Sequence, residues 1–147
     1  MNPWRHFLSV ILAGVAATWA SGSAACTVST TPLVFGAVDP LAGMPTDSAG
    51  SFTVNCPEAT SYVVAISGGN GPVHNRFMAG ASDQLIYQLY TDAGLNYIWG
   101  DGTAGTNTVS GSTSPMQAEH TVYGRIPSQP LARAGQYTDV VIITVSY

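Results

Sequence analysis

The sequence predicts an all-β protein, built as a β-sandwich, and three observations support this. Seven or so short runs of β-branched and aromatic residues alternate in polarity, which is the period-two pattern of half-buried strands. Clusters of Gly, Pro, Asn and Asp separate these runs at the short spacing that is typical of sandwiches. Beyond the first 25 residues no segment has the 3.6-residue period of an amphipathic helix, and the length suits one domain with its own core.

Residues 1–25 differ from the rest of the chain and have the composition of a secretory signal peptide. A short start containing Arg5 precedes the apolar run 7–20, and small residues fill 21–25. The run is short for a membrane-spanning helix, which favours a cleavable signal. We expect no stable membrane insertion of the chain after cleavage. The predicted organisation is a cleavable signal peptide over residues 1–25 and one domain over residues 26–147.

We expect cleavage after Ala25, because Ser23 and Ala25 fit the small-residue rule for signal cleavage. Cleavage after Ala24 or Ala20 is the alternative. A lipoprotein signal would attach a lipid to Cys26, but Ser23 occupies the position where such signals carry a large aliphatic residue. We therefore disfavour a lipid anchor.

The charge balance is acidic and charged residues are rare. The chain has no lysine, four arginines and eight acidic residues, and its net charge is −4. Without the leader, three arginines remain against the eight acids, a net charge of −5. Nucleic-acid binding is not expected, because it requires clustered Lys and Arg to neutralise phosphates.

Cys26 and Cys56 are the two cysteines of the chain. In an exported protein they predict one disulfide. Closing a loop of this length stabilises a fold by roughly 3–4 kcal/mol if the effect is chain entropy alone. The bond would join the start of the first strand to the end of the second.

Three strands are predicted in the first half of the domain: a first strand made of Val28 and residues 33–38 and broken by Pro32, a second over residues 51–56 and a third over residues 62–66. Asp39-Pro40 closes the first of them, and a glycine-rich turn ends the third. The second strand alternates cleanly, and one face of it carries Phe52, Val54 and Cys56.

The second half has further predicted strands at residues 85–90, 106–109 and 120–126. Leu85, Tyr87 and Leu89 share one face of the first. Residues 97–99 lead into Asp101-Gly102, which is a good hairpin turn, and residues 111–115 are expected to form a flexible loop. In the last of these strands we expect Val122 and Ile126 to point inward and Arg125 outward.

The final strand, residues 140–147, runs to the last residue of the sequence. One face carries Val141, Ile143, Val145 and Tyr147, and the other carries Val140, Ile142, Thr144 and Ser146. A strand of this kind needs a neighbour on each side, because an open apolar edge is a template for aggregation. Two interpretations remain open: the neighbour comes from the same chain, or another polypeptide supplies it.

No pattern predicts catalysis or metal binding. His74 and His120 are far apart in sequence and have no metal-ligand spacing, and no Ser lies in a nucleophile-elbow motif. Asp92 and Asp101 are expected to be turn residues, because the repeated acids of a calcium loop are absent. We expect no enzyme, no cofactor and no bound metal; a hydrolase would require one of the histidines beside a nucleophile in a cleft.

Aromatic residues cluster between positions 87 and 99, which leaves one binding function open. Tyr87, Tyr90, Tyr97 and Trp99 could form a platform that stacks on sugars. Aromatics that alternate in a sandwich are more often core residues and cross-strand pairs. A stand-alone secreted glycan-binding or coat module is therefore the alternative function.

Several motifs in order resemble the spore coat protein U domain family over essentially all of residues 26–147. The motifs in the C-terminal half are 85–92 (LIYQLYTD), 99–103 (WGDGT), 121–127 (TVYGRIP), 134–139 (AGQYTD) and 144–147 (TVSY). Those in the N-terminal half are 26–28 (CTV), 35–40 (FGAVDP), 54–56 (VNC) and 76–78 (RFM).

The resemblance implies an incomplete immunoglobulin-like sandwich of the pilin type, which lacks its last strand. The family includes subunits of archaic chaperone–usher pili, which support adhesion and biofilm formation. In such subunits a periplasmic chaperone supplies the missing strand and a neighbouring subunit later replaces it. The implied partners are this chaperone, an outer-membrane usher and other pilin-like subunits, and the implied location is the periplasm and then the cell surface.

The resemblance also assigns roles to residues. Val141, Ile143, Val145 and Tyr147 would line or border the groove for the donated strand. Gly124, Gly135 and Asp101-Gly102 match positions that need special backbone geometry, and Arg125 could pair with Asp139. The remaining motif residues to which we assign structural roles are Trp99, Gly100, Tyr123 and Tyr137.

Cleavage after Ala25 would leave no residues ahead of Cys26, whereas strand-donating pilins carry roughly a dozen or more there. We therefore expect a chain that accepts a strand but does not donate one. A subunit at a fibre tip, a self-contained coat-type protein or an error in the assigned start site would each account for this.

Overall fold

The structure is a computed structural model, and it describes residues 25–113 and 116–147. Within these residues it is an all-β sandwich of two sheets, as the sequence predicts. Residues 1–24, which hold nearly all of the predicted signal peptide, lie outside the described residues. The part of the chain that is described contains no helix long and apolar enough to span a membrane.

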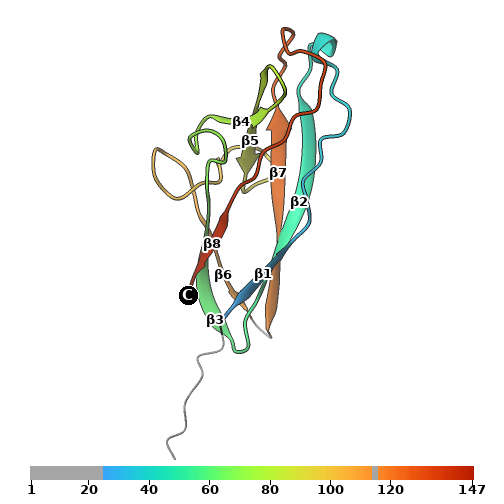
Figure 1. Ribbon diagram of the computed structural model, residues 1–147. Helices are drawn as coiled ribbons and strands as arrows, with labels where there is room; N and C mark the ends of the chain where they lie inside the picture. Colours follow the sequence, from blue (N-terminus) through green and yellow to red (C-terminus); the bar gives the residue numbers. More distant parts are fainter. Residues whose placement is uncertain (1–24, 114–115) are drawn as a thin grey trace, which may run out of the picture.

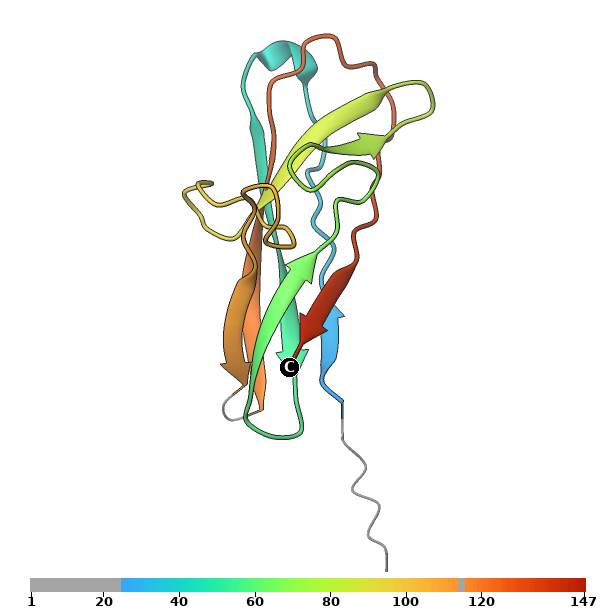
Figure 2. The same ribbon diagram turned by 90° about the vertical axis from the view of Figure 1, so that its left-hand side faces the viewer.

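The larger sheet has five strands in the order β1-β2-β7-β5-β4 (Figures 1 and 2). Their bounds are Thr27–Thr30 (β1), Thr46–Asn55 (β2), Gln117–Ile126 (β7), Gln84–Tyr90 (β5) and Arg76–Ala79 (β4). Every neighbouring pair is antiparallel. The longest ladder joins β2 to β7 from Thr46↔Ile126 to Asn55↔Gln117 and forms the back of the sandwich.

The smaller sheet has three antiparallel strands in the order β6-β3-β8. Their bounds are Val109–Thr113 (β6), Thr60–Ile66 (β3) and Ile143–Ser146 (β8). A single turn of 3-10 helix, η1 (Pro40–Ala42), lies in the connection between β1 and β2, and Asp39 caps it by accepting a hydrogen bond from the amide of Leu41.

The core lies between the sheets and follows the alternation of the strands. Phe52, Val54 and Cys56 point inward from β2 and are buried, as the sequence predicts. Trp99 stacks on Phe52 with ring centroids 5.0 Å apart. The other buried apolar side chains come from β3, β5 and β7: Tyr62, Val64, Ile66, Leu85, Tyr87, Leu89, Val122 and Ile126.

The disulfide between Cys26 and Cys56 is present, with Cα atoms 4.3 Å apart. Thr27 pairs with Asn55 at the next position of the β1–β2 ladder. The bond therefore joins the start of β1 to the end of β2, as predicted. Arg125 points outward as predicted, but it pairs with Asp47 rather than Asp139, through two N···O contacts of 2.6 Å across the β2–β7 ladder.

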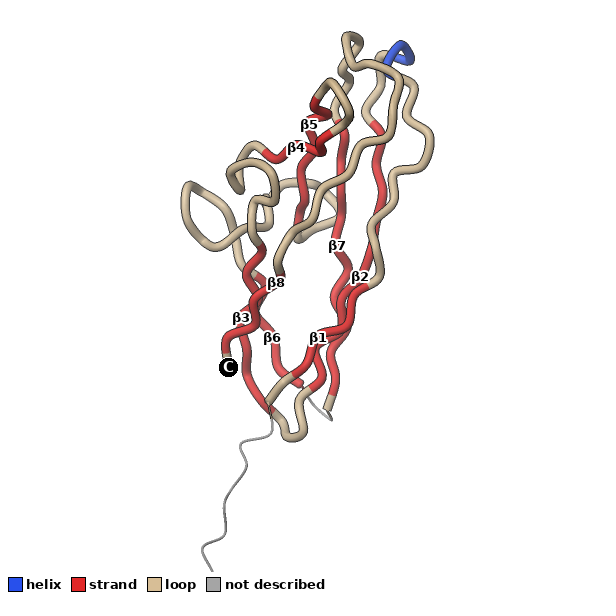
Figure 3. The backbone as a smooth tube through the Cα atoms, in the orientation of Figure 1, coloured by secondary structure: helices blue, strands red, loops and turns tan. Residues whose placement is uncertain are grey.

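The predicted first strand is confirmed at Val28 and wrong at residues 33–38: β1 spans Thr27–Thr30, and residues 31–38 form a loop beside β2 (Figure 3). Pro32 has no N–H to donate to a ladder, and Gly36 has φ +71°, which interrupts an extended strand. Leu33 and Phe35 still point inward and pack on the core. The alternation of the sequence is thus preserved without the main-chain pairing.

Four other segments also differ from expectation. Residues 97–99 make isolated bridges rather than a strand, and β4 was not predicted. The strand predicted at 106–109 lies at Val109–Thr113, so most of the predicted flexible loop is strand. The final strand is shorter than predicted, because residues 140–142 leave the ladder and only Ile143–Ser146 pair with β3.

Candidate functional site: an open groove along one side of the sandwich

One side of the sandwich is closed by the chain itself. Residues 97–100 cross between the sheets: the amide of Trp99 donates to Leu89 O of β5 at 2.9 Å, and Ile66 of β3 donates to Gly100 O at 3.0 Å. The indole Nε1 of Trp99 also donates to Val64 O at 3.2 Å. This segment therefore satisfies main-chain groups of both sheets and covers the core on that side.

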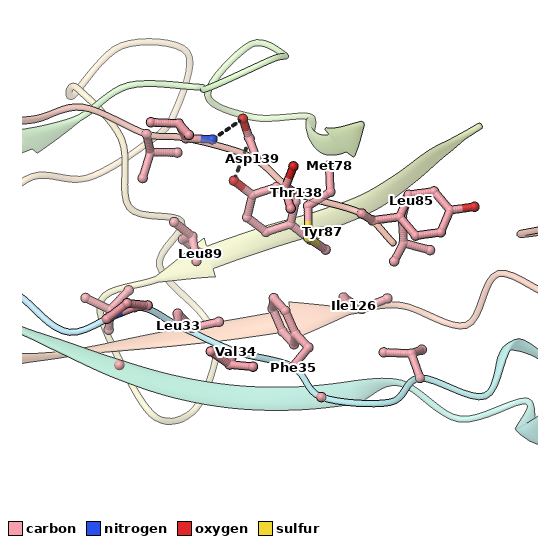
Figure 4. A pocket seen from close by; sticks show the side chains of 18 of the residues that line it. Leu33, Val34, Phe35, Met78, Leu85, Tyr87, Leu89, Ile126, Thr138 and Asp139 are labelled. Carbon is pink, nitrogen blue, oxygen red and sulfur yellow. Dashed lines mark hydrogen bonds between the residues drawn. The ribbon is translucent and has the colours of Figure 1, made fainter. Parts of the chain in front are cut away.

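The opposite side is open. β1 and β8 are edge strands of different sheets, and neither pairs with the other. Between them runs a groove of about 960 Å³. We call residues 31–38 its N-terminal wall and residues 137–146 its C-terminal wall; in the latter, residues 137–141 and Ile143 line the groove. Figure 4 shows side chains of both walls across from one another, with β5 and β7 between them.

The base of the groove is apolar and comes from the core of the sandwich. Phe52 of β2, Leu89 of β5 and Trp99 line it, and all three side chains are buried members of the core. Other apolar residues that line it are Ile66, Met78, Leu85, Tyr87, Val122 and Ile126. An apolar surface of this extent, open along one side, is the typical signature of a binding site.

The C-terminal wall presents unpaired main-chain groups to the groove. The amide of Ser67 donates to Ile142 O at 2.9 Å, so these two residues form a hydrogen-bonded pair. The pairs Ala65↔Thr144 and Val63↔Ser146 follow at intervals of two residues along β3 and β8. In an antiparallel ladder the residues between such pairs direct their N–H and C=O groups to the other side. These residues are Val141, Ile143 and Val145, and the main chain of Val141 makes no hydrogen bond within the described residues.

The N-terminal wall lies close against β7. A Cβ atom at Gly124 would lie 2.8 Å from Phe35 Cζ and 3.0 Å from the Leu33 methyl groups. Gly124 faces inward between Val122 and Ile126. Because it has no side chain, Phe35 and Leu33 can occupy the space in front of it. Few hydrogen bonds hold this wall: Thr31 donates to Ser51 O at 2.9 Å, and Ser48 Oγ donates to Val34 O at 2.6 Å.

Asp139 and Tyr87 form the main polar contact of the groove (Figure 4). The Tyr87 hydroxyl donates to Asp139 Oδ2 at 2.7 Å. Burial and the adjacent Asp139 carboxylate raise the pKa of Tyr87, so the phenol remains a donor at neutral pH. The Tyr87 ring also meets Phe35 of the N-terminal wall edge to face, at 6.3 Å.

Of the four residues predicted to line or border the groove, two line it and two do not. Val141 and Ile143 line it. Val145 is half-buried and packs on the core further along β8, and Tyr147 is 61% exposed. The sequence analysis did not assign Leu33, Phe35 and Tyr87 to the groove. Their alternation was visible in the sequence, but the sequence did not show which edge of the sandwich the strand order leaves open.

Among the other motif residues, Trp99, Gly135, Tyr137 and Asp139 line the groove, whereas Gly100, Gly102, Tyr123, Gly124 and Arg125 do not. Gly102 has φ +85°, and Gly100 approaches Thr106 so closely that a Cβ would lie 2.3 Å from its hydroxyl. Gly135 has neither a positive φ nor a close neighbour. Tyr137 packs over Gly80 and donates to Arg133 O at 2.7 Å, and Tyr123 pairs with Tyr90 in the β5–β7 ladder.

The four aromatic residues considered for a sugar platform do not share one exposed surface. Trp99 is 1% exposed and Tyr87 is buried, whereas Tyr97 lies on the surface. Asp92 and Asp101 accept hydrogen bonds from amides of their own turns. Among the described residues no group of three His, Cys, Asp or Glu side chains could hold a metal ion.

His120 is half-buried rather than solvent-facing. Its ring stacks on Phe52 with centroids 4.9 Å apart, and its Nε2 lies 2.6 Å from the Tyr62 hydroxyl. Partial burial lowers the pKa of His120. His74, by contrast, is exposed in the loop before β4. Neither histidine has a nucleophile as its partner.

Comparison with known proteins agrees with this architecture. The sequence matches the family described as Spore Coat Protein U domain over residues 11–144. The chain belongs to the spore coat protein U domain family. No curated protein matches it.

Two solved structures share the sandwich of this spore coat protein U domain. One is a chain of the CsuC–CsuE chaperone–tip adhesion subunit pre-assembly complex from archaic chaperone–usher Csu pili of Acinetobacter baumannii. The two are 20% identical with a TM-score of 0.59, and the match covers 84% of this chain but 40% of the other. The second is a chaperone–usher pilus studied for rod uncoiling, 15% identical with a TM-score of 0.56, over 95% of this chain and 99% of that one. At these identities the likeness shows a common fold.

Proposed function

We propose that this protein is a non-catalytic structural subunit of an archaic chaperone–usher pilus, and that its groove accepts a β-strand from another polypeptide. The observation that carries the proposal is the free edge of β8 beside an apolar groove whose base is made by core side chains. Val141, Ile143 and Val145 direct main-chain groups to the groove and side chains to the core. This is the arrangement needed for strand addition, in which the main chain gives affinity and alternate side chains fill pockets.

The energetics favour a strand over a small ligand. Each Val or Ile side chain that a donated strand buries in the groove would contribute about 1.5–3 kcal/mol before the cost of ordering the strand. The strand would also satisfy the unpaired N–H and C=O groups of the C-terminal wall, which a small apolar ligand would leave buried without partners. The groove is therefore suited to an extended peptide with alternating apolar residues.

The family and the shared fold suggest the order of partners. A periplasmic chaperone would supply the strand first, and a neighbouring pilin-like subunit would replace it at an outer-membrane usher. The predicted signal peptide would direct the chain to the periplasm, and the assembled subunit would lie at the cell surface. Adhesion and biofilm formation would then follow from the fibre rather than from a site in this domain.

Co-expression with a cognate periplasmic chaperone tests the proposal. We expect a higher periplasmic yield and a one-to-one complex that survives purification. Expression without the chaperone should give less protein, and protein that aggregates more readily, because the groove and the free edge of β8 are left uncovered. An unchanged yield together with no complex would contradict the proposal.

A further inference from the structure

Asp139 is the acidic residue among the described residues that line the groove, and it lies in the C-terminal wall just before the free edge. The turn that connects β3 to β4 holds its carboxylate. Asp139 Oδ1 accepts a hydrogen bond from the amide of Asn70 at 3.0 Å and another from Val140 at 2.8 Å. Gly69 makes room for it, because a Cβ there would lie 2.2 Å from Asp139 Oδ2.

This turn is itself fixed by a buried cation. Arg76 is fully buried and donates to Ser67 O through Nε at 3.2 Å and Nη2 at 2.9 Å. Ser67 in turn donates its amide to Ile142 O, and its hydroxyl accepts from the Ile142 amide at 2.8 Å. The segment between Asp139 and Ile142 is thus attached at both ends to a turn that Arg76 holds in place.

The second oxygen of Asp139 connects this wall to the opposite one. Asp139 Oδ2 accepts the Tyr87 hydroxyl, and the same Tyr87 ring contacts Phe35 of the N-terminal wall. Tyr87 therefore lies across the groove between its two walls. Its position depends on the carboxylate that its hydroxyl binds.

We infer that Asp139 is a positioning residue of the groove, which fixes the register of the C-terminal wall so that Val141 and the residues after it present their main-chain groups to an incoming strand. The inference rests on the proposed function for the identity of that strand, but the positioning itself is a property of the free chain. Without the carboxylate, the segment from Thr138 to Ile142 keeps hydrogen bonds to Ala79, Asn70 and Ser67, and its bonds to Ala79 and Ser67 should open more often.

Amide hydrogen exchange on the mature chain, followed residue by residue, tests the inference. The variant is Asp139→Ala, and Tyr87→Phe is a milder second variant that keeps the buried ring and removes only the hydroxyl. The matched control is Asp92→Ala, because the Asp92 carboxylate also accepts two loop amides, from Asn96 and Tyr97 at 2.9 Å each, but lies away from the groove.

The reporters are the amides of Thr138, Ile142 and Ala79. In Asp139→Ala we expect their exchange to accelerate about tenfold or more, as for the loss of a hydrogen bond to a charged group, while amides of β7 keep their wild-type rates. Tyr87→Phe should show a smaller acceleration at the same amides, and Asp92→Ala none. Unchanged exchange at these amides in Asp139→Ala, or equal acceleration in β7, would overturn the inference.

Capture by the chaperone, measured on the same proteins, separates the two proposals. If the wild-type chain is captured and Asp139→Ala is captured at least about tenfold less than Asp92→Ala, both stand. If the reporters accelerate but capture is unchanged, Asp139 orders the wall without preparing it for a strand, so the inference is overturned and strand acceptance stands. If the wild-type chain itself is not captured although the reporters accelerate, strand acceptance fails and the role of Asp139 in ordering the wall stands.

Discussion

Trp99 Nε1 lies 3.2 Å from Val64 O and donates a hydrogen bond to it, which joins the segment after β5 to the middle of the opposite sheet. Both residues are fully or almost fully buried. On this side the chain supplies a segment that bonds both sheets and covers the core. On the other side, between β1 and β8, the described residues supply no such segment, and the groove occupies its place.

Replacing Trp99 with Ala should therefore destabilise the fold strongly. The change removes a buried ring stacked on Phe52 and leaves Val64 O without its partner, so we expect a loss of about 3–5 kcal/mol in unfolding free energy. Urea denaturation of the purified protein measures this. The control is Tyr97→Ala, which removes an exposed aromatic two residues away and should change stability by less than about 0.5 kcal/mol. Equal effects would show that Trp99 is not part of the core.

Two adjacent isoleucines test which face of the final strand meets the donated strand. Ile143 lines the groove, whereas Ile142 is 67% exposed on the outer face. Ile143→Thr should reduce capture by the chaperone at least about tenfold, because it places a hydroxyl in an apolar pocket. Ile142→Thr is the same chemical change one position away and should leave capture within about twofold of wild type. A larger effect at Ile142 would place the binding face on the outside of the sheet.

Gly124 should tolerate no side chain. A methyl group at this position would lie 2.8 Å from Phe35 Cζ and 3.0 Å from the Leu33 methyl groups, which is inside van der Waals contact, so the N-terminal wall would have to move. We expect Gly124→Ala to cost about 1–3 kcal/mol and to increase proteolysis within residues 31–38. Gly135→Ala is the matched control, because its Cβ would have open space and its φ is not positive. Similar stability of the two variants would argue against close packing of the wall on β7.

Stability should fall in mild acid because of His120. Its pKa is below the ordinary value of 6.5 in the folded protein, since desolvation disfavours the imidazolium beside Phe52 and Tyr62. As pH falls below 6.5, the unfolded chain binds this proton and the folded chain resists it, so unfolding is favoured until the folded pKa is reached.

Thermal unfolding between about pH 7 and pH 5 measures the effect. We expect the melting temperature of the wild type to decrease over this range and His120→Gln to lose much of that decrease. His74→Gln removes an exposed histidine and should behave as the wild type does. If all three proteins follow the same curve, His120 does not contribute to the pH dependence.

The sequence predicted what depends on local alternation and missed what depends on pairing. Phe52, Val54 and Cys56 alternate in a run without Gly or Pro, so both the strand and its buried face were predictable. Residues 33–38 alternate in the same way, but Pro32 and the positive φ of Gly36 prevent a ladder there. Within residues 33–38 only Gly36 departs from the pattern of a strand, so the sequence does not distinguish a strand from an extended loop there.

The site was predictable in part for a similar reason. Val141 and Ile143 line the groove, and the family resemblance assigned them to it; the period of the final strand grouped them on one face but did not say which face turns to the groove. Leu33, Phe35 and Tyr87 come from three segments that meet only through the sheet order, which no spacing in the sequence specifies. The Tyr87–Asp139 bond joins residues 52 positions apart and was likewise invisible.

The most direct test of strand acceptance is the hydrogen exchange of the Val141, Ile143 and Val145 amides in the free chain and in its complex with the chaperone. These amides face the groove, so they should exchange rapidly in the free chain and slow by on the order of a hundredfold or more when a donated strand bonds to them. The amides of Thr144 and Ser146, which face β3, should already be protected in the free chain and change much less. Slow exchange of Val141, Ile143 and Val145 in the free chain, or no change on complex formation, would contradict the account.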